Sequence, residues 1–148
     1  MSVITHVWKK KISRQIGQNY VASPIQATKD VDVVISAIGG RAVGNHEIVK
    51  NTAEKLLTDL PAAGVKRLLW VGGAGSLEVA PGVELVTVPD FPAEYKDEAI
   101  AIGEAIKVFR TTSSDLNWTF VSPAAEIFPG EKQAPYRIGG DQLLADEQ

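Results

Sequence analysis

The stretch RLLWVGGAGS, residues 67–76, decides the fold of this chain. A largely apolar run of five residues is followed by three glycines within four positions. Such a run predicts a strand that is buried on both faces, as in parallel sheets. The glycines then fall at the carboxyl end of the strand, the edge where open α/β sheets bind ligands. A tight turn that needs glycine at positive φ explains the motif equally well, so both readings stay open.

Two further runs have the same character: VDVVISAIGG at residues 31–40 and NWTFVSPA at residues 117–124. Between the three runs, apolar residues recur at helical spacing, first at Val49, Ala53, Leu56, Leu57 and Leu60, and then at Tyr95, Ala99, Ile102, Ile106 and Phe109. This alternation predicts an α/β fold with a parallel sheet flanked by helices. We expect residues 31–38, 67–71 and 118–121 to be adjacent parallel strands.

Polar residues and prolines mark the ends of the expected helices. Asn45 is a candidate N-cap of the first helix, and Pro61 is expected to stop it. Pro92 suits the first turn of the second helix. Downstream of Gly130 the pattern is weaker, and YRIGG predicts a short edge strand while DQLLADEQ predicts a turn or a helix start.

The chain divides into a basic segment, residues 1–30, and an α/β domain, residues 31–148. The first segment holds five basic residues and one acidic residue, a net charge of +4. Because the whole chain has a net charge of −3, residues 31–148 carry −7. Within the segment, four apolar residues fit one helical face: Ile4, Trp8, Ile12 and Ile16. We expect a solvated basic segment here.

Composition excludes several classes of function. The 148 residues are 45% hydrophobic, which suits one ordinary domain with a core. The chain has no cysteine, so it has no disulfide, thiolate zinc site or cysteine nucleophile, and its two separated histidines predict no metal site. The negative net charge argues against nucleic acid as a partner. No apolar run has the length of a membrane span, and we expect a cytoplasmic protein.

The glycine motif does not have the sequence of a phosphate-binding loop. Such a loop opens a helix, whose free N–H groups hold the phosphate. After Ser76, however, Pro81, Gly82, Pro89 and Pro92 leave no room for a long helix. The motif also lacks the Gly-Lys-Ser/Thr ending and the Gly-x-Gly-x-x-Gly spacing.

Four longer motifs carry a family resemblance: VKRLLWVGGAGSLEVAPGVELV, PDFPAEYKDEA, LNWTFVSPAAEIFPGE and YRIGGDQLL. They are similar to those of NAD(P)H-binding proteins grouped as NADH-flavin reductases, atypical relatives of the short-chain dehydrogenases, from about Asp32 onward. The resemblance implies a Rossmann fold and NAD(P) as cofactor. Family members carry a Gly-x-x-Gly-x-x-Gly loop after their first strand, whereas Gly17 is the only glycine before Val31. We therefore expect a partial Rossmann-like fold, corresponding to the middle and latter half of such a protein, with impaired cofactor binding.

The resemblance also assigns the cofactor site to the ends of the three strands. Its residues flank the adenosine side (Ser36, Ala37, Ile38 and Gly39), lie under the nicotinamide ribose (Gly72, Gly73 and Ala74) and lie beside the nicotinamide (Ser122, Pro123 and Ala124). Gly39 and Gly40 serve equally well as a plain strand-to-helix turn. Ser76 and Tyr95 are the candidate substrate-binding residues, with a turn serine and an exposed helix residue as the structural alternatives.

No catalytic residue is predicted. Short-chain dehydrogenases use Tyr-x-x-x-Lys, but Ala99 stands four positions after Tyr95, and the adjacent Lys96 would point about 100° away on a helix. Three functions stay open: an NAD(P)H-binding oxidoreductase with flavin or quinone as acceptor, a non-catalytic nucleotide-binding regulator, and a degenerate domain that acts through oligomerisation. We expect a homo-oligomer that uses the edge at residues 31–38 or the N-terminal segment.

Overall fold

The structure is a computed structural model that describes residue 28 and residues 30–41, 44–131 and 135–145. Its centre is a parallel sheet of three strands in the order β1 (Val33–Ser36), β2 (Arg67–Val71) and β5 (Asn117–Val121). Val33 pairs with Arg67, and Arg67 pairs with Asn117 on its other side. The expectation of adjacent parallel strands is confirmed.

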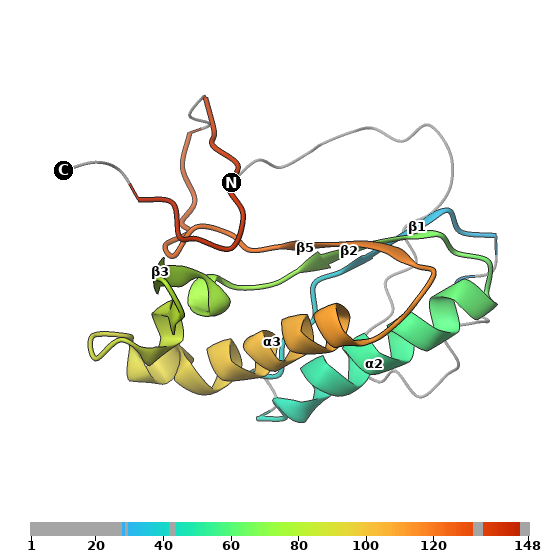
Figure 1. Ribbon diagram of the computed structural model, residues 1–148, viewed down its shortest axis with the longest axis horizontal. Helices are drawn as coiled ribbons and strands as arrows, with labels where there is room; N and C mark the ends of the chain where they lie inside the picture. The colour runs from blue at the N-terminus through green and yellow to red at the C-terminus, as the bar shows by residue number, and fades with distance from the viewer. Residues whose placement is uncertain (1–27, 29, 42–43, 132–134, 146–148) are drawn as a thin grey trace.

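Both long helices cover the same face of this sheet. Helix α2 (Glu47–Ala62) connects β1 to β2, and helix α3 (Ala93–Thr111) lies between β2 and β5 in the chain. Strands added in one direction through right-handed crossovers place their helices on one side. Figure 1 shows α2 and α3 packed side by side against that side.

The core lies between the helices and the sheet. The buried residues of α2 are the five that helical periodicity predicts: Val49, Ala53, Leu56, Leu57 and Leu60. On α3, Phe109 is 1% exposed and packs its ring 5.2 Å from the rings of both Trp70 and Trp118. Aromatic pairs of this kind, edge-on with Trp70 and tilted with Trp118, add to the apolar burial that holds the layers together.

The first helix begins and ends differently from the sequence-based expectation. His46, not Asn45, is the N-cap residue, and no side chain there caps the helix by a hydrogen bond. Pro61 lies inside the last turn rather than stopping it. The chain leaves the helix through Gly64, at φ +82°, while Val65 N–H donates to Leu60 O at 2.9 Å. This is the Schellman arrangement, in which glycine at the left-handed position ends the helix.

No long helix follows the glycine motif, as the prolines predict. Instead the chain forms a short helical turn, η2 (Ala74–Ser76), a two-stranded hairpin of β3 (Glu78–Ala80) and β4 (Val83–Glu84), and a second turn, η3 (Leu85–Thr87). Gly82 turns the hairpin at φ +74°. The turn η2 packs against α3, so the motif is anchored to the helix layer.

The expected edge strand at YRIGG is wrong, since residues 136–140 form no strand. The next residues make a single bridge instead, between Gln142 and Glu78 of the hairpin. Residues 141–145 are not helical either, and residues 146–148 and 1–27 lie outside the described part. Within the part that the structure describes, none of the helices has both the length and the apolar character needed to cross a membrane.

Candidate functional site

The three strand ends that the sequence singles out meet at one edge of the sheet. Ser36 pairs with Trp70, and Val71 pairs with Val121, so the strands end nearly level. The ladder extends one residue further, because Gly72 N–H donates to Val121 O at 2.9 Å. The segments 36–39, 72–74 and 122–124 therefore follow three neighbouring strands at their carboxyl edge.

Close packing explains two of the glycines in the motif at residues 72–75. A Cβ on Gly72 would stand 2.0 Å from the Phe120 ring, and one on Gly75 would stand 2.8 Å from Ala99 Cβ. Gly73 is different, since its Cβ would meet nothing nearer than Ile102 at 3.5 Å, an ordinary contact. Gly73 is extended, at φ −138°, and no glycine of the motif has positive φ. The positive-φ turn is therefore the wrong explanation for this motif.

The loop after β1 is held by the backbone. Asn45 N–H donates to Gly40 O at 3.0 Å, and a Cβ on Gly40 would stand 2.2 Å from Asn45 O. Gly40 thus permits the sharp turn from the strand toward α2. A Cβ on Gly39 would stand 2.5 Å from Glu98 Oε1, so a carboxylate of α3 lies against this loop.

The two candidate substrate-binding residues have different environments. Tyr95 is 45% exposed at the start of α3, and the Arg41 guanidinium lies 4.4 Å from the centre of its ring. This cation–π contact joins the loop after β1 to α3. Ser76 Oγ is inaccessible, faces Gly103 of α3 and has no hydrogen-bond partner among the described residues. Of the two, Tyr95 is the side chain that a ligand can reach.

Sequence reasoning missed Glu98 and Arg41. Glu98 lies on α3, and Arg41 lies in the loop after β1. In a sequence, a charged residue at either kind of position indicates only that the side chain is exposed to solvent. Their placement beside Gly39 and Tyr95 depends on how α3 crosses the strand ends, which no local pattern encodes.

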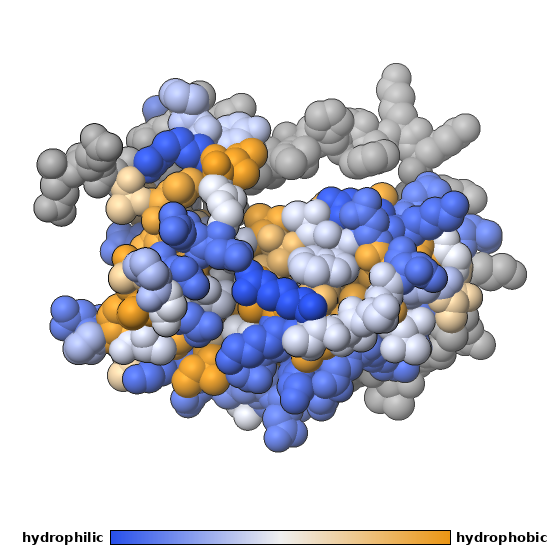
Figure 2. All heavy atoms as spheres, viewed as in Figure 1, coloured by the Kyte–Doolittle hydropathy of each residue, from blue (hydrophilic) through white to orange (hydrophobic). Residues whose placement is uncertain are grey.

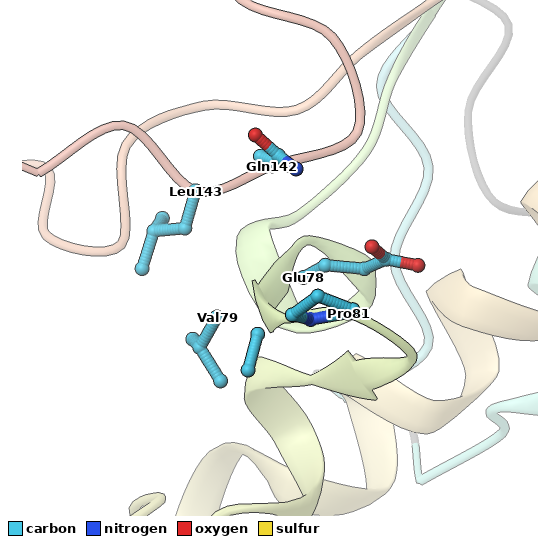
Figure 3. A pocket seen from close by; sticks show the side chains of 6 residues that line it. Glu78, Val79, Pro81, Gln142 and Leu143 are labelled. Atoms are coloured by element: carbon cyan, nitrogen blue, oxygen red, sulfur yellow. The ribbon is translucent and has the colours of Figure 1, made fainter.

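A separate pocket lies between the hairpin and the C-terminal segment. Its lining comes from two stretches far apart in sequence, namely Glu78, Val79, Ala80, Pro81, Gln142 and Leu143. Figure 3 shows Gln142 and Leu143 on one side and the hairpin residues on the other. Two hydrogen bonds join these stretches: Glu78 N–H donates to Asp141 O at 2.8 Å, and Leu143 N–H donates to Glu78 O at 2.9 Å. None of the sequence-predicted site residues lines this pocket.

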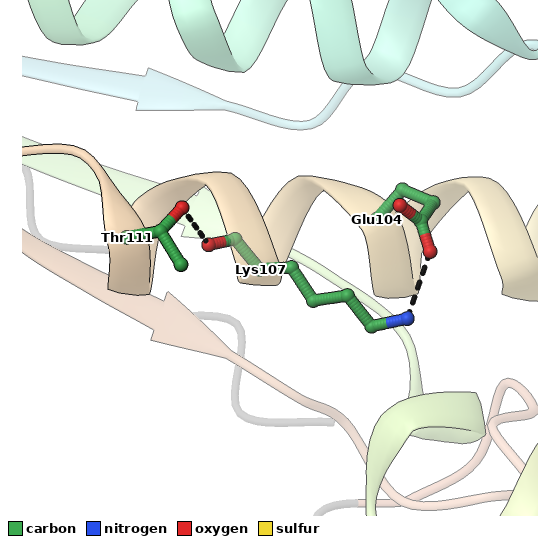
Figure 4. A network of polar contacts seen from close by, with 3 residues as sticks. All are labelled: Glu104, Lys107 and Thr111. Atoms are coloured by element: carbon green, nitrogen blue, oxygen red, sulfur yellow. Dashed lines mark hydrogen bonds and ion pairs between the residues drawn. The ribbon is translucent and has the colours of Figure 1, made fainter.

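The shifted ionisations lie on the exposed side of α3. Lys107 Nζ donates to Glu104 Oε1 at 2.8 Å, and this hydrogen bond lowers the pKa of Glu104 and raises the pKa of Lys107. Thr111 Oγ1 donates to Lys107 O one turn later (Figure 4). Within the described ranges, no three metal-ligating side chains cluster to form a metal site.

Comparison with known proteins identifies the family to which this chain belongs. The sequence profile of the family described as NAD(P)H-binding matches residues 15–146. An uncharacterized Bacillus subtilis protein, YwnB, is 38% identical over 121 residues, which is 80% of this chain and 56% of that protein.

Solved structures are also similar to this chain. A Burkholderia pseudomallei protein described as a "putative exported protein" is 44% identical, with a TM-score of 0.74 over 83% of this chain and 59% of that one. A Streptococcus pneumoniae protein described as a "putative NADH-flavin reductase" is 35% identical, with a TM-score of 0.73 over the same shares. The chain spans a little over half the length of these relatives. On the match of the family profile and these likenesses, the chain belongs to the NAD(P)H-binding family, with a Rossmann-like fold.

Proposed function

We propose that this chain contributes the nicotinamide-side half of a dinucleotide site in an NAD(P)H-dependent oxidoreductase. The observation that carries the proposal is the meeting of segments 36–39, 72–74 and 122–124 at the carboxyl edge of three parallel strands. Ligands of open α/β sheets bind at this edge. The family match supports a nicotinamide dinucleotide as the ligand.

The described residues fit the nicotinamide part of that cofactor. Gly73 has an extended backbone, and its Cβ position makes only an ordinary contact with Ile102 at 3.5 Å, which supports the approach of a ligand to its main chain. Gly72, Gly73 and Ala74 would lie under the ribose, and Ser122, Pro123 and Ala124 would hold the carboxamide side. Ser36, Ala37 and Gly39 would border the adenosine part. When bound, the reduced cofactor supplies a hydride, and these residues orient its ring.

The fit to the pyrophosphate is poor, and we propose that binding by this chain is weak. Gly17 is the only glycine before Val31, so the N-terminal sequence offers no glycine-rich loop to hold the phosphates. In addition, the Glu98 carboxylate lies against Gly39, where it repels phosphate charge.

A flavin or a quinone is the proposed acceptor. Hydride transfer between a nicotinamide and a flavin needs no protein acid in principle, since the cofactors carry the chemistry. The absence of a lysine four positions after Tyr95 is therefore compatible with this reaction. The Streptococcus pneumoniae relative, described as a "putative NADH-flavin reductase", supports the same reaction class. We place the protein in the cytoplasm, which the lack of cysteine suits.

The second candidate is a nucleotide-binding regulator without catalysis, or a degenerate domain that acts by oligomerisation. Tyr95 favours it, because the cation beside its ring is Arg41, at 4.4 Å, and no lysine stands four positions after it as in the Tyr-x-x-x-Lys motif of short-chain dehydrogenases. A steady loss of reduced-nicotinamide absorbance with riboflavin or a quinone present, above the rate without protein, separates the enzyme from this alternative.

Hydrogen exchange with and without millimolar NADPH tests the site itself. We expect slower exchange in peptides that cover residues 36–40, 72–76 and 122–124, and unchanged exchange in the C-terminal half of α2. Slowing only around the pocket at Glu78 and Gln142, or nowhere, would contradict the proposed site. Calorimetric titration should give a Kd weaker than about 1 μM, an energy less favourable than about −8 kcal/mol.

A further inference from the structure

The sheet face opposite α2 and α3 carries two kinds of residue. Its side chains come from alternate positions of the three strands. Four of them are exposed and apolar, namely Val33 (38%), Ile35 (67%), Val71 (40%) and Val121 (46%), and Leu69 is partly buried among them. The other three form a polar corner: Arg67, Asn117 and Thr119. Parallel sheets are ordinarily covered on both faces, so this face lacks a layer among the described residues.

The polar corner holds a positive charge in a fixed position. Arg67 Nη2 donates to Thr119 Oγ1 at 2.6 Å, and Nη1 donates to Asn117 O at 3.1 Å and to Asn117 Oδ1 at 3.3 Å. These acceptors are neutral, and within the described ranges no carboxylate forms an ion pair with Arg67. A purely apolar cover would bury this charge without a partner, which is costly. A layer that fits the face therefore needs both apolar side chains and a carboxylate.

A segment of this composition follows β5. Residues 125–131 and 135–140, called the arm, contain no helix or strand, and Figure 1 shows them on the side of the sheet away from α2 and α3. The large apolar side chains of the arm are exposed: Ile127 (55%), Phe128 (72%), Tyr136 (71%) and Ile138 (83%). Figure 2 shows apolar surface over the hairpin and the C-terminal segment. The arm also carries Glu126 and Glu131, which form no ion pair among the described residues.

We propose that the arm of one copy of this chain covers the open sheet face of a second copy, and that the exchange is reciprocal. The apolar side chains of the arm cover the apolar part of the face, and Glu131 pairs with Arg67. The partner thus supplies the carboxylate that the face lacks.

The spacing of the residues selects Glu131 as the partner of Arg67. Four residue steps along β2 separate Val71 from Arg67, about 13 Å. Four steps also separate Ile127 from Glu131, which reach up to about 13 Å when extended. Ile127 can therefore lie at Val71 while Glu131 meets Arg67. Glu126 is adjacent to Ile127 and lies too near the apolar end to take this place.

The size of the two surfaces favours a second copy. The arm exposes on the order of 600 Å² of apolar residue surface and the face on the order of 300 Å², whereas a stable interface between two chains buries about 800 Å² on each. Neither surface is sufficient alone, but a reciprocal exchange buries both on each chain. Such an exchange also closes as a two-fold dimer.

Sedimentation equilibrium of the full chain with charge-exchange variants tests the pair. We expect the unchanged chain to dimerise at tens of micromolar, and Glu131→Arg and Arg67→Glu each to raise the dimer dissociation constant at least fivefold. The variant with both changes should return to within twofold of the unchanged chain, because the charges have only changed places. Glu126→Arg, the same change of charge on the same arm, is the matched control and should alter the constant less than twofold.

Thiol labelling tests the contact independently, and it applies even if Arg67→Glu does not fold. The chain has no cysteine, so Ile35→Cys reports on the face, and Ile100→Cys, at a 46% exposed position on α3, is the control. We expect alkylation at position 35 to slow at least fivefold from low to high micromolar protein, and alkylation at position 100 to stay constant. Adding Phe128→Asp to Ile35→Cys should remove the concentration dependence.

Each other outcome overturns the proposal. A monomer at tens of micromolar would do so, as would equal effects of Glu131→Arg and Glu126→Arg, or a double variant that folds by circular dichroism but is not restored. Protection of position 35 that does not depend on concentration would assign the cover to the same chain. Dimerisation with position 35 unprotected would assign the contact to another surface, such as the edge of β1, which leaves the sheet face open.

Discussion

The carboxylate of Glu98 lies against the loop at Gly39, with Oε1 2.5 Å from where a Cβ on Gly39 would stand. Gly39 follows β1 at the edge of the sheet where the dinucleotide is proposed to bind. A fixed negative charge at this point opposes an anionic ligand. Removal of the Glu98 charge is therefore a direct test of the proposed site.

Glu98→Gln should strengthen NADPH binding. A unit charge a few ångströms from a solvent-accessible phosphate is worth up to about 1 kcal/mol, so we expect a two- to fivefold lower Kd. Glu94→Gln, one turn earlier on α3, is the matched control for net charge. A fluorescence titration in which both variants change Kd equally would show that Glu98 has no special place in the site.

Substitution of the two adjacent glycines, Gly72 and Gly73, should affect stability to different extents. Gly72→Ala places a Cβ 2.0 Å from the Phe120 ring and should cost about 1–3 kcal/mol of unfolding free energy. Gly73→Ala meets only an ordinary contact with Ile102 and should change stability by less than about 0.5 kcal/mol. Thermal and denaturant unfolding measure the change in stability of each variant.

Gly73→Val then tests whether the loop lines a cleft. If it does, residual NADPH binding should be lost while the fold is largely kept. Reduced thermal stability with no selective effect on binding would show that Gly73 has only a structural role.

Local period predicts α2 well, because its 3.6-residue repeat identifies all five buried residues of that helix. It predicts α3 poorly, because only Phe109 of the five residues at helical spacing is buried there. The expectation that the strands are buried on both faces is wrong among the described residues, since burial alternates along β1 and β2. The N-cap is wrong because the Asn45 backbone is engaged with Gly40, a contact set by the loop. The strand expected at YRIGG is wrong because a strand needs a partner. In the described part of the C-terminal segment only Gln142 meets one, 64 residues away at Glu78. Glu98 reaches Gly39 through the packing of α3 on the loops, which is likewise a long-range effect.

Phe109→Ala should be among the most damaging single changes in the core. The ring is 1% exposed and touches Trp70, Trp118 and Phe120, with ring centres 5.2–6.1 Å away. Truncation of a buried phenylalanine costs about 3–5 kcal/mol. Ile100→Ala, on the exposed side of the same helix, should cost far less. Urea unfolding followed by tryptophan fluorescence compares the two, and similar losses would contradict the described packing.

The Glu104–Lys107 pair should give a small, pH-dependent stabilisation of α3. The folded pKa of Glu104 lies below its ordinary value of 4.5, so its contribution is full above that pH and is lost as the pH falls through the folded pKa. The pKa of Lys107 is raised, so its contribution is lost only as the pH rises above 10.5. Both side chains are about half exposed, which limits the effect to a few tenths of a kcal/mol. Glu104→Gln should therefore lower the Tm slightly near neutral pH and have no effect near about pH 3. A loss that persists at low pH would show that packing, not charge, accounts for the change.

The edge of β1 should drive self-association. Among the described residues β1 pairs only with β2, so its other side presents unpaired N–H and C=O groups. In the usual Rossmann order the first strand pairs with the fourth. The family resemblance gives the place of the fourth strand to residues 32–38. We expect a homodimer or higher oligomer in sedimentation equilibrium, with amide exchange at residues 33–36 slowing as concentration rises. Strand β5, the opposite edge of the described sheet, is the internal control and should exchange at a constant rate. A well-folded monomer of 15.9 kDa at tens of micromolar, or slowing confined to β5, would contradict association through β1.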